Sequence, residues 1–394
     1  MDIVLLLVAL LGHAALWVAV INRAHAVGWH RRTVFRVSAV LFGVLLAPPA
    51  VLGGWVLYTL WTGGSPRAAW SAVDWSRPGP LALAAYLVAT VGFAALTASQ
   101  WFGRLVLGRR PHILRSHRTR RMEIRAVAGP CPPEPRHFLV RLSGNQILSL
   151  DVTERAIDVP RLPPELDGLL IVHMSDFHFT GLVPKEYFQE VIRHSNELEP
   201  DLVAITGDLI DSPECLDWIP ETFGRLRARH GVYFVLGNHD VQVDLGRLLA
   251  VLAESGLIHL GGRWIEIEVR GQRVVLAGNE RPWLPAAADL GDCPPRPAGP
   301  PRIFLAHTPD QLPWARRYDA DLLLAGHLHG GQIRLPLVGP IFSPSYLGVT
   351  YASDLFYAPP TILHVSRGVS GEVPVRLNCP PEITLLRLHG PTAV

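Results

Sequence analysis

Residues 169–178 have the sequence LLIVHMSDFH, in which a short apolar run ends in Asp176 and His178. Continuous apolar runs of this length are typical of strands that are buried on both faces of a sheet. Similar runs lie at residues 202–206, 232–236, 273–277, 303–306 and 322–325, and helical patterns at 185–198, 216–229 and 245–254 separate several of them. This alternation predicts an α/β fold or a layered α-β-β-α architecture.

Five of these apolar runs end in a cluster of Asp, Asn or His. The clusters are Asp176-Phe177-His178, Gly207-Asp208-Leu209-Ile210-Asp211, Gly237-Asn238-His239-Asp240, His307 and Gly326-His327-Leu328-His329-Gly330-Gly331-Gln332. Ligand groups in such sheets belong in the loops beyond the strand ends, so we expect these side chains to meet. A single histidine near a core is more often structural, but five clusters together indicate a metal site.

The residue types restrict the metal. Mixed carboxylate, amide and imidazole ligands suit manganese, iron, zinc or nickel, and the absence of cysteine from the clusters argues against structural zinc. The four cysteines, Cys131, Cys215, Cys293 and Cys379, are too far apart for a paired ligand motif. We interpret them as isolated buried thiols, although the sequence leaves a disulfide open.

These motifs resemble those of the calcineurin-like metallophosphoesterases, specifically the bacterial branch with a membrane-attached catalytic domain. The resemblance covers residues 157–388 and includes MSDFH at 174–178, LAHTPD at 305–310 and PPEIT at 380–384. It implies two facing sheets flanked by helices and two divalent metal ions. It also implies that Asp208 bridges the two metals. The other ligands of one metal would be Asp176, His178 and His329, and the other ligands of the second metal would be Asn238, His307 and His327.

The chemistry expected of such a site is hydrolysis of a phosphoester by a hydroxide that bridges the metals. His239, next to Asn238, is the candidate acid for the leaving oxygen. We expect Asp240 to orient His239. Asp211 is either a second supporting residue or a helix cap or turn residue.

Three positions depart from familiar family patterns. Leu328 stands where many relatives have Thr, but it is not a ligand position, so the metal site should survive. Ser212 stands where protein serine/threonine phosphatases have Arg, which argues against a protein phosphatase. Residues 279–281, Asn-Glu-Arg, stand where we expect acidic residues, which leaves substrate recognition by this loop open.

Residues 3–21, 37–61 and 81–102 contain no charged side chain, and their lengths meet the roughly 20 residues that a membrane helix requires. We predict three transmembrane helices; the alternative is buried core helices of a soluble protein. Four arginines lie between the first two spans and eight within 104–125. This bias favours a cytoplasmic catalytic domain. Pro48 and Pro49 leave a re-entrant hairpin open.

The predicted organisation is three transmembrane helices within 1–103, a basic juxtamembrane segment and linker at 104–156, and a metallophosphoesterase domain at 157–390. Short strands are expected at 138–142 and 147–152 in the linker. Residues 1–150 contain 16 basic and 4 acidic side chains. We expect the arginine cluster to contact anionic membrane lipids and not nucleic acid, because no aromatic platform accompanies it.

The sequence therefore predicts a membrane-anchored enzyme that cleaves a phosphodiester or pyrophosphate bond, with a lipid-linked substrate at the inner membrane face as the main hypothesis. The alternatives are the same chemistry on a soluble nucleotide or phosphodiester, and a membrane scaffold with an inactive metal site. The aromatic, proline-rich residues 337–360 are either an apolar lid over a lipid substrate or a shielded core loop.

Overall fold

The computed structural model describes residues 3–71, 73–74, 76–106, 112–124, 135–285, 287–293 and 299–391. The chain divides into two compact units, Met1–Arg109 and Arg110–Val394. Parts of the predicted basic segment, residues 107–111 and 125–134, lie outside the described residues, as does Cys131. Cys215, Cys293 and Cys379 are buried free thiols, as expected.

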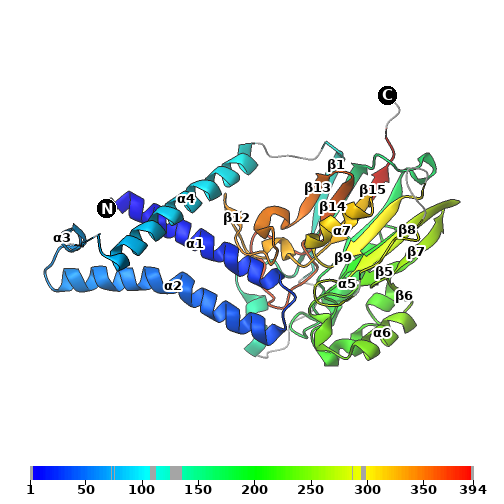
Figure 1. Cartoon of the computed structure of the whole chain (residues 1–394). Coiled ribbons are helices and arrows are strands. Elements are labelled where there is room, and N and C mark those ends of the chain that lie inside the picture. Colours follow the sequence, from blue (N-terminus) through cyan, green and yellow to red (C-terminus); the bar gives the residue numbers. More distant parts are fainter. Residues whose placement is uncertain are drawn as a thin grey trace. The chain divides into compact units, whose positions relative to one another are not determined.

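The N-terminal unit is helical (Figure 1). Its helices are α1 (Ile3–Ala26), α2 (Arg31–Trp61), α3 (Pro66–Ser71) and α4 (Pro78–Val106). Helices α1, α2 and α4 are each long and apolar enough to cross a membrane, in agreement with the three predicted spans. Helix α1 packs against both α2 and α4.

Two prolines lie inside α2 without interrupting it, so the second span is one helix and not a re-entrant hairpin. Because Pro49 has no N–H, it cannot donate to the carbonyl oxygen of Leu45 one turn earlier. Nε2 of His13 on α1 lies 3.1 Å from that oxygen, and Nδ1 of His13 lies 2.5 Å from the hydroxyl oxygen of Tyr86 on α4. His13 therefore occupies the place of the missing donor and links three helices.

The C-terminal unit contains two large sheets and a small hairpin (Figure 1). The first sheet has the order β1-β2-β15-β3-β4-β5-β6, with β1 (Leu114–Glu123), β2 (Ser149–Asp158), β3 (Leu169–Met174), β4 (Leu202–Thr206), β5 (Val232–Val235), β6 (Leu257–His259) and β15 (Glu382–His389). The second has the order β13-β14-β10-β9-β8-β7, with β7 (Trp264–Val269), β8 (Gln272–Asn279), β9 (Arg302–Ala306), β10 (Leu322–Ala325), β13 (Asp354–Ala358) and β14 (Thr361–Val365). The hairpin pairs β11 (Arg334–Leu335) with β12 (Gly339–Pro340).

Alternating side chains of the strands define the layers, because successive residues of a strand point to opposite faces. Leu322 and Leu324 of β10 belong to the core between the two sheets, whereas Leu323 packs in the outer cluster that includes α7 (Leu312–Arg317). On the first sheet, Val172 of β3 lies in the outer cluster that includes α5 (Lys185–Asn196) and α6 (Leu245–Glu254). The predicted α-β-β-α architecture is confirmed.

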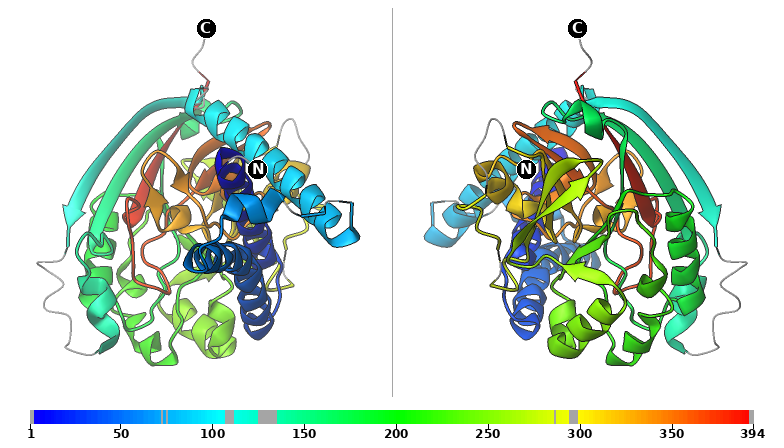
Figure 2. Two further views of the ribbon diagram at one scale, coloured as in Figure 1. Left: turned by 90° about the vertical axis from the view of Figure 1, so that its left-hand side faces the viewer. Right: turned by 90° about the vertical axis from the view of Figure 1, so that its right-hand side faces the viewer.

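The segment expected to be a linker contributes two strands to the first sheet. Strands β1 and β2 form a long curved antiparallel pair at its edge (Figure 2), and β2 continues the sheet by pairing with β15. The strand predicted at 147–152 overlaps β2. The strand predicted at 138–142 is wrong, because Pro135–Arg141 form a 3₁₀ helix.

The long helix predicted at 216–229 is also wrong. Two short 3₁₀ helices, Pro213–Trp218 and Phe223–Arg225, occupy this region. Pro220 lies between them and cannot donate the backbone hydrogen bond that a continuous helix needs. The helices predicted at 185–198 and 245–254 are present as α5 and α6.

Candidate metal centre

Five of the predicted metal ligands lie on backbone in the left-handed conformation, which Asp and His adopt more readily than most residues. Their φ angles are +54° at Asp176, +47° at His178, +54° at Asp208, +71° at His327 and +49° at His329. The strand ends also approach closely. A Cβ atom on Gly326 would lie only 2.7 Å from Oδ2 of Asp176. The sharp turns after β3, β4 and β10 therefore bring polar side chains together.

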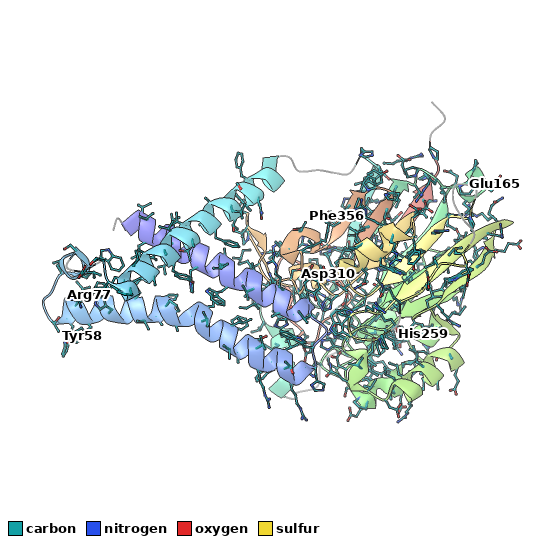
Figure 3. All side chains as sticks on the ribbon, in the orientation of Figure 1. Tyr58, Arg77, Glu165, His259, Asp310 and Phe356 are labelled. Carbon is teal, nitrogen blue, oxygen red and sulfur yellow. The ribbon has the colours of Figure 1, made fainter. Side chains whose placement is uncertain are left out.

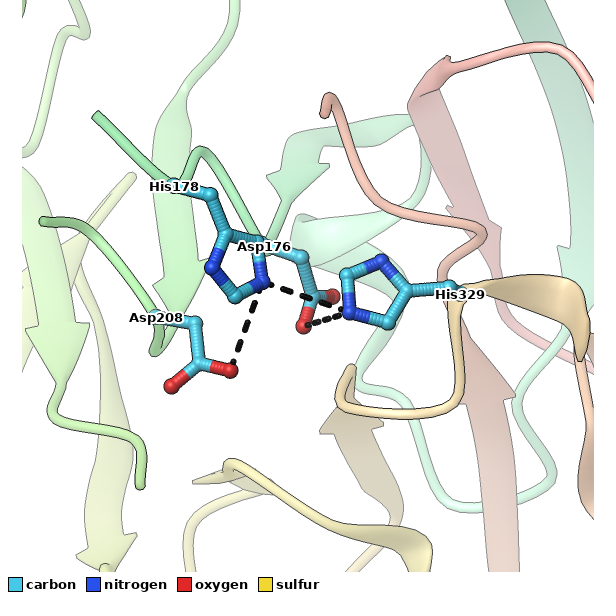
Figure 4. Close-up of side chains that lie close together, drawn as sticks. All are labelled: Asp176, His178, Asp208 and His329. Carbon is cyan, nitrogen blue, oxygen red and sulfur yellow. Dashed lines mark hydrogen bonds and ion pairs between the residues drawn. The ribbon is translucent and has the colours of Figure 1, made fainter. Parts of the chain in front are cut away.

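The first group of candidate ligands consists of Asp176, His178, Asp208 and His329 (Figure 4). One ligand atom of each lies within 4.8 Å of the others. Nε2 of His178 lies 3.5 Å from Oδ2 of Asp208 and 3.3 Å from Nε2 of His329. Nε2 of His329 lies 3.7 Å from Oδ1 of Asp176. The structure thus brings together all four residues predicted for one metal.

The second group consists of Asp208, His307 and His327, whose ligand atoms are equally close. Nε2 of His307 lies 3.2 Å from Oδ2 of Asp208, 3.1 Å from Nδ1 of His327 and 3.0 Å from Oδ1 of Asn238. The Asp208 oxygen that faces His307 is the same oxygen that faces His178 in the first group. Asp208 therefore lies between the two groups.

Contacts outside the centre fix the orientation of three histidine rings. Nδ1 of His178 donates to Oδ2 of Asp211 at 2.8 Å, and Nδ1 of His307 donates to the carbonyl oxygen of Thr206 at 2.8 Å. Nδ1 of His329 lies 3.3 Å from the carbonyl oxygen of Ser370. Each ring therefore presents Nε2 to the centre, as metal-binding histidines do when their other nitrogen is hydrogen-bonded.

The donor set fits two divalent ions. Imidazole nitrogens that bind one metal at 2.0–2.1 Å stand roughly 3.3 Å apart in a tetrahedral site. The facing nitrogens of His178 and His329, at 3.3 Å, and of His307 and His327, at 3.1 Å, have this separation. Carboxylate and imidazole donors without cysteine suit borderline divalent cations.

His239 lies beside the first group, with its ring centroid 4.6 Å from that of His178. Its Nδ1 is hydrogen-bonded to Oδ1 of Asp211, and its Nε2 lies 3.9 Å from the Glu372 carboxylate. Burial lowers the pKa of His239, but the carboxylates of Asp208 and Asp211 outweigh burial and raise it to about 10. These two carboxylates therefore favour the protonated form of the imidazole.

Asp211, and not Asp240, is the residue that contacts the ring of His239. The two oxygens of Asp211 bind His239 and His178 respectively, so one carboxylate orients both rings. Asp240 instead accepts backbone hydrogen bonds from Leu209 and Ile210 at Oδ1, at 2.8 and 3.1 Å, and from Gly237 at Oδ2, at 2.8 Å. It joins the loops after β4 and β5, and burial followed by repulsion from Asp208 raises the pKa of Asp240 to about 7.

Two residues at the centre escaped sequence reasoning. Arg376 is completely buried and donates to the carbonyl oxygens of His329 and Arg367, both at 2.8 Å. The Trp283 ring lies with its centroid 4.6 Å from that of His327 and 5.4 Å from that of His307. A lone arginine in an arginine-rich chain gives no sequence signal. Trp283, however, adjoins the loop at 279–281 that departs from the family pattern.

Two of the residues that depart from the family pattern, Glu280 and Leu328, are buried in the interior. Glu280 is buried and accepts hydrogen bonds from the Leu236 N–H at 2.7 Å and from Nε2 of His259 at 2.6 Å, so this side chain holds β5 and β6 against the end of β8. Leu328 is buried in the outer core of the second sheet. Neither side chain disturbs the candidate ligands.

Comparison with known proteins agrees with this geometry. The model of the calcineurin-like phosphoesterase family matches residues 169–331. The chain is 32% identical over 252 residues to an uncharacterized metallophosphoesterase of Bacillus subtilis, YkuE, in a match that covers 61% of this chain and 85% of that protein. It is 31% identical over 226 residues to the phosphodiesterase YaeI of Escherichia coli, in a match that covers 55% of this chain and 81% of that protein.

The name of a third relative describes a transmembrane protein. The chain is 32% identical over 260 residues to a transmembrane protein with metallophosphoesterase domain from Bos taurus, and the match covers 60% of this chain and 57% of the relative. The extent of the matches to the two bacterial proteins is enough to establish ancestry. This chain belongs to the calcineurin-like metallophosphoesterase family and is a metal-dependent phosphoester hydrolase.

Proposed function

We propose that the enzyme hydrolyses a phosphodiester or pyrophosphate bond of a lipid-linked substrate at the inner membrane face. The observation that carries the hydrolytic part is the position of Asp208, whose Oδ2 faces an imidazole of each ligand group. One ion would be held by Asp208 with Asp176, His178 and His329, and a second by Asp208 with Asn238, His307 and His327. Two bound divalent ions supply a polarised phosphoryl oxygen and an activated water.

The protein residues supply the proton. Nδ1 of His239 is hydrogen-bonded to Oδ1 of Asp211, which fixes the direction of the ring and leaves Nε2 as the nitrogen that would carry the transferable proton. The imidazolium is the candidate proton donor to the leaving oxygen. It would also stabilise the negative charge that develops on that oxygen as the ester bond breaks. Because Asp211 also holds His178, the position of the acid is coupled to the position of a candidate ligand.

The membrane part of the proposal is supported by the three apolar helices in the same chain. Helix α4 ends at Val106 and β1 begins at Leu114, so a short connection tethers the catalytic unit to a membrane segment. Exposed arginines on β1, among them Arg118 and Arg120, suit anionic lipid headgroups. We do not expect a nucleic acid as substrate.

The substrate class is tested with the full chain reconstituted in vesicles and supplied with manganese, zinc, iron or nickel. Hydrolysis of a membrane-embedded pyrophosphate or phosphodiester lipid is compared with hydrolysis of bis-p-nitrophenyl phosphate in solution, with Asp208→Asn as the inactive control. Higher kcat/KM for the lipid is expected. Turnover of the soluble ester alone would favour a soluble substrate, and no turnover with any metal would favour an inactive scaffold.

The arginine bias supports a cytoplasmic catalytic unit, and sidedness is tested in intact cells. A reporter that fluoresces only in the cytoplasm, fused after Val394, is expected to fluoresce. Protease added outside the inner membrane is expected to spare the residues beyond 130. A dark reporter together with cleavage would place the site outside and exclude cytoplasmic lipid precursors as substrates.

A further inference from the structure

An exposed apolar segment borders the metal centre. We call residues 333–347 the apolar loop. The exposed large apolar side chains of this loop and of the neighbouring residue 373 are Ile333, Leu335, Leu337, Val338, Phe342, Tyr346, Leu347 and Val373. In the rest of the described catalytic unit only Phe138, Leu142 and Val241 are comparably exposed. Such a concentration of exposed apolar side chains in one segment indicates an interaction site.

The tip of the apolar loop has unusual chemistry for a turn. Residues 336–338, Pro-Leu-Val, connect β11 to β12, where Gly, Asn or Asp is the usual choice. Leu337 is 87% exposed and has a φ of +65°, a conformation that is unfavourable for leucine. A leucine held out at a turn despite its backbone cost indicates that the side chain itself is required.

Both ends of the apolar loop are fixed to loops that carry candidate ligands. At one end, Gln332 follows His329 by three residues, and its Nε2 donates to the carbonyl oxygen of Val373 at 2.5 Å. At the other end, Oγ of Ser345 and the N–H of Tyr346 donate to the carboxylate of Asp310, labelled in Figure 3, at 2.6 and 3.0 Å. Asp310 follows His307 by three residues. The exposed surface is therefore held in place beside the centre.

The composition of the apolar loop suits a bilayer interface. It contains one arginine and no acidic residue, so an anionic membrane would not repel it. Pro336, Pro340 and Pro344 have no N–H, which reduces the number of backbone donors that must find partners away from water. Phe342 and Tyr346 are exposed aromatic residues of the kind that concentrate at membrane interfaces.

We propose that the apolar loop, with Val373, inserts into the bilayer that contains the membrane helices of the same chain. The occupant of this surface is lipid, at the boundary between headgroups and acyl chains. The membrane helices supply that bilayer at all times, so the loop needs no separate recruitment. Insertion would bring the loops that carry His307 and His329 to the level of the headgroups. The proposal holds whichever phosphoester the enzyme cleaves.

Photocross-linking tests the proposal without measuring activity. Leu337 is replaced by benzoylphenylalanine in the full chain, which is reconstituted in vesicles of phosphatidylcholine and phosphatidylglycerol, irradiated and analysed by mass spectrometry. Phe138, an apolar residue that is 61% exposed outside the loop, and the polar Asp217 receive the same cross-linker as matched controls. Lipid adducts are expected at position 337 in clear excess over both controls.

A second variant separates insertion from mere proximity. The cross-linker is placed at Phe342, and the yield of lipid adduct is compared with and without Leu337→Ser. Loss of one buried leucine side chain should weaken insertion and lower the yield of lipid adduct roughly tenfold or more. Folding should be unaffected, because Leu337 is exposed, and an unchanged melting temperature verifies this. Adducts to a second copy of the chain, equal lipid adducts at 337 and 138, or no lipid adduct would each overturn the proposal.

Discussion

The two ligand groups differ in the neighbouring residues that contact and support the candidate ligands. Charged side chains support the first group, because Asp211 bonds to His178 and Arg376 donates to the backbone of His329. The backbone and an aromatic ring support the second group, because the Thr206 carbonyl bonds to His307 and Trp283 packs on His327. Substitution of the residues that support the first group should therefore change charge and proton transfer. Substitution of those that support the second group should change packing.

Asp208→Asn should have the largest effect, because Asp208 is shared by both groups. The amide keeps the shape but loses the charge that offsets the repulsion between two cations. Loss of several kcal/mol of stabilisation corresponds to a fall in turnover of about 10³-fold or more. Turnover of bis-p-nitrophenyl phosphate and metal content by plasma mass spectrometry check this. Wild-type turnover with full metal occupancy would refute a shared carboxylate, and chelation should abolish wild-type activity until a divalent metal is restored.

His239→Ala should act only on the chemistry next to the first group. Turnover should fall roughly 10²–10⁴-fold, the range for general acid catalysis, with metal content nearly unchanged. The loss should be smaller for nitrophenyl than for alkyl esters, since a good leaving group needs no proton. Equal losses with both leaving groups would contradict the acid role and assign His239 to electrostatic stabilisation alone.

Asp211→Asn should weaken the first group specifically. Loss of a carboxylate that orients a metal-binding histidine typically lowers metal affinity 10–100-fold. Metal titration should therefore show one weakened site and one nearly unchanged site. Trp283→Ala, which removes packing behind the second group, serves as the matched comparison and should leave the first site unchanged. If Asp211→Asn weakened both sites equally, the two groups would not be supported independently.

The smallest effect concerns pH and a histidine pair between the sheets. Nδ1 of His173 on β3 lies 2.7 Å from Nδ1 of His364 on β14, and Nε2 of His173 lies 2.9 Å from Oγ1 of Thr206. Burial lowers the pKa of His173 to about 3 and that of His364 well below its ordinary value of 6.5. The unfolded chain therefore binds more protons than the folded chain in mildly acidic solution.

The stabilisation from neutral His173 should be complete above pH of about 6.5 and should decrease as the pH falls. Between neutral pH and pH of about 5, protonation of His173 in the unfolded chain should by itself lower the free energy of unfolding of the protein by about 2 kcal/mol. Melting temperatures at the two pH values check this, and His173→Gln should make the melting temperature less dependent on pH. A variant with the same acid sensitivity as the wild type would show that other groups dominate.

Central strands and the ligand clusters could be predicted because their signals are local. Strands β4 and β10 have the predicted bounds, since each is an uninterrupted apolar run between polar turns. The clusters after β3, β4, β5, β9 and β10 converge because parallel strands of both sheets end at the same edge. The α-β-β-α layers follow from the same alternation.

The remaining features depend on contacts between residues far apart in sequence. Strand β1 is rich in arginine and almost fully exposed, so its sequence has no alternating apolar pattern that would predict a strand. It pairs with β2 at the edge of the sheet. His239 is adjacent to Asp240 in sequence, yet its ring bonds to Asp211, 28 positions earlier. Arg376 reaches His329 from a loop 47 positions later. Sequence proximity was a poor guide to each of these partners.

The left-handed backbone at the candidate ligands also limits how the centre can evolve. Glutamate and cysteine are competent metal ligands, but Asp, Asn and His are the residues that tolerate a positive φ, and Asp176, His178, Asp208, His327 and His329 all have one. Conformation therefore narrows the set of acceptable replacements before coordination is considered. In a saturation library, Asp176→Glu should survive selection less often than Asp176→Asn, although glutamate preserves the charge. Ancestral variation at these turns would then reflect main-chain geometry as much as metal preference.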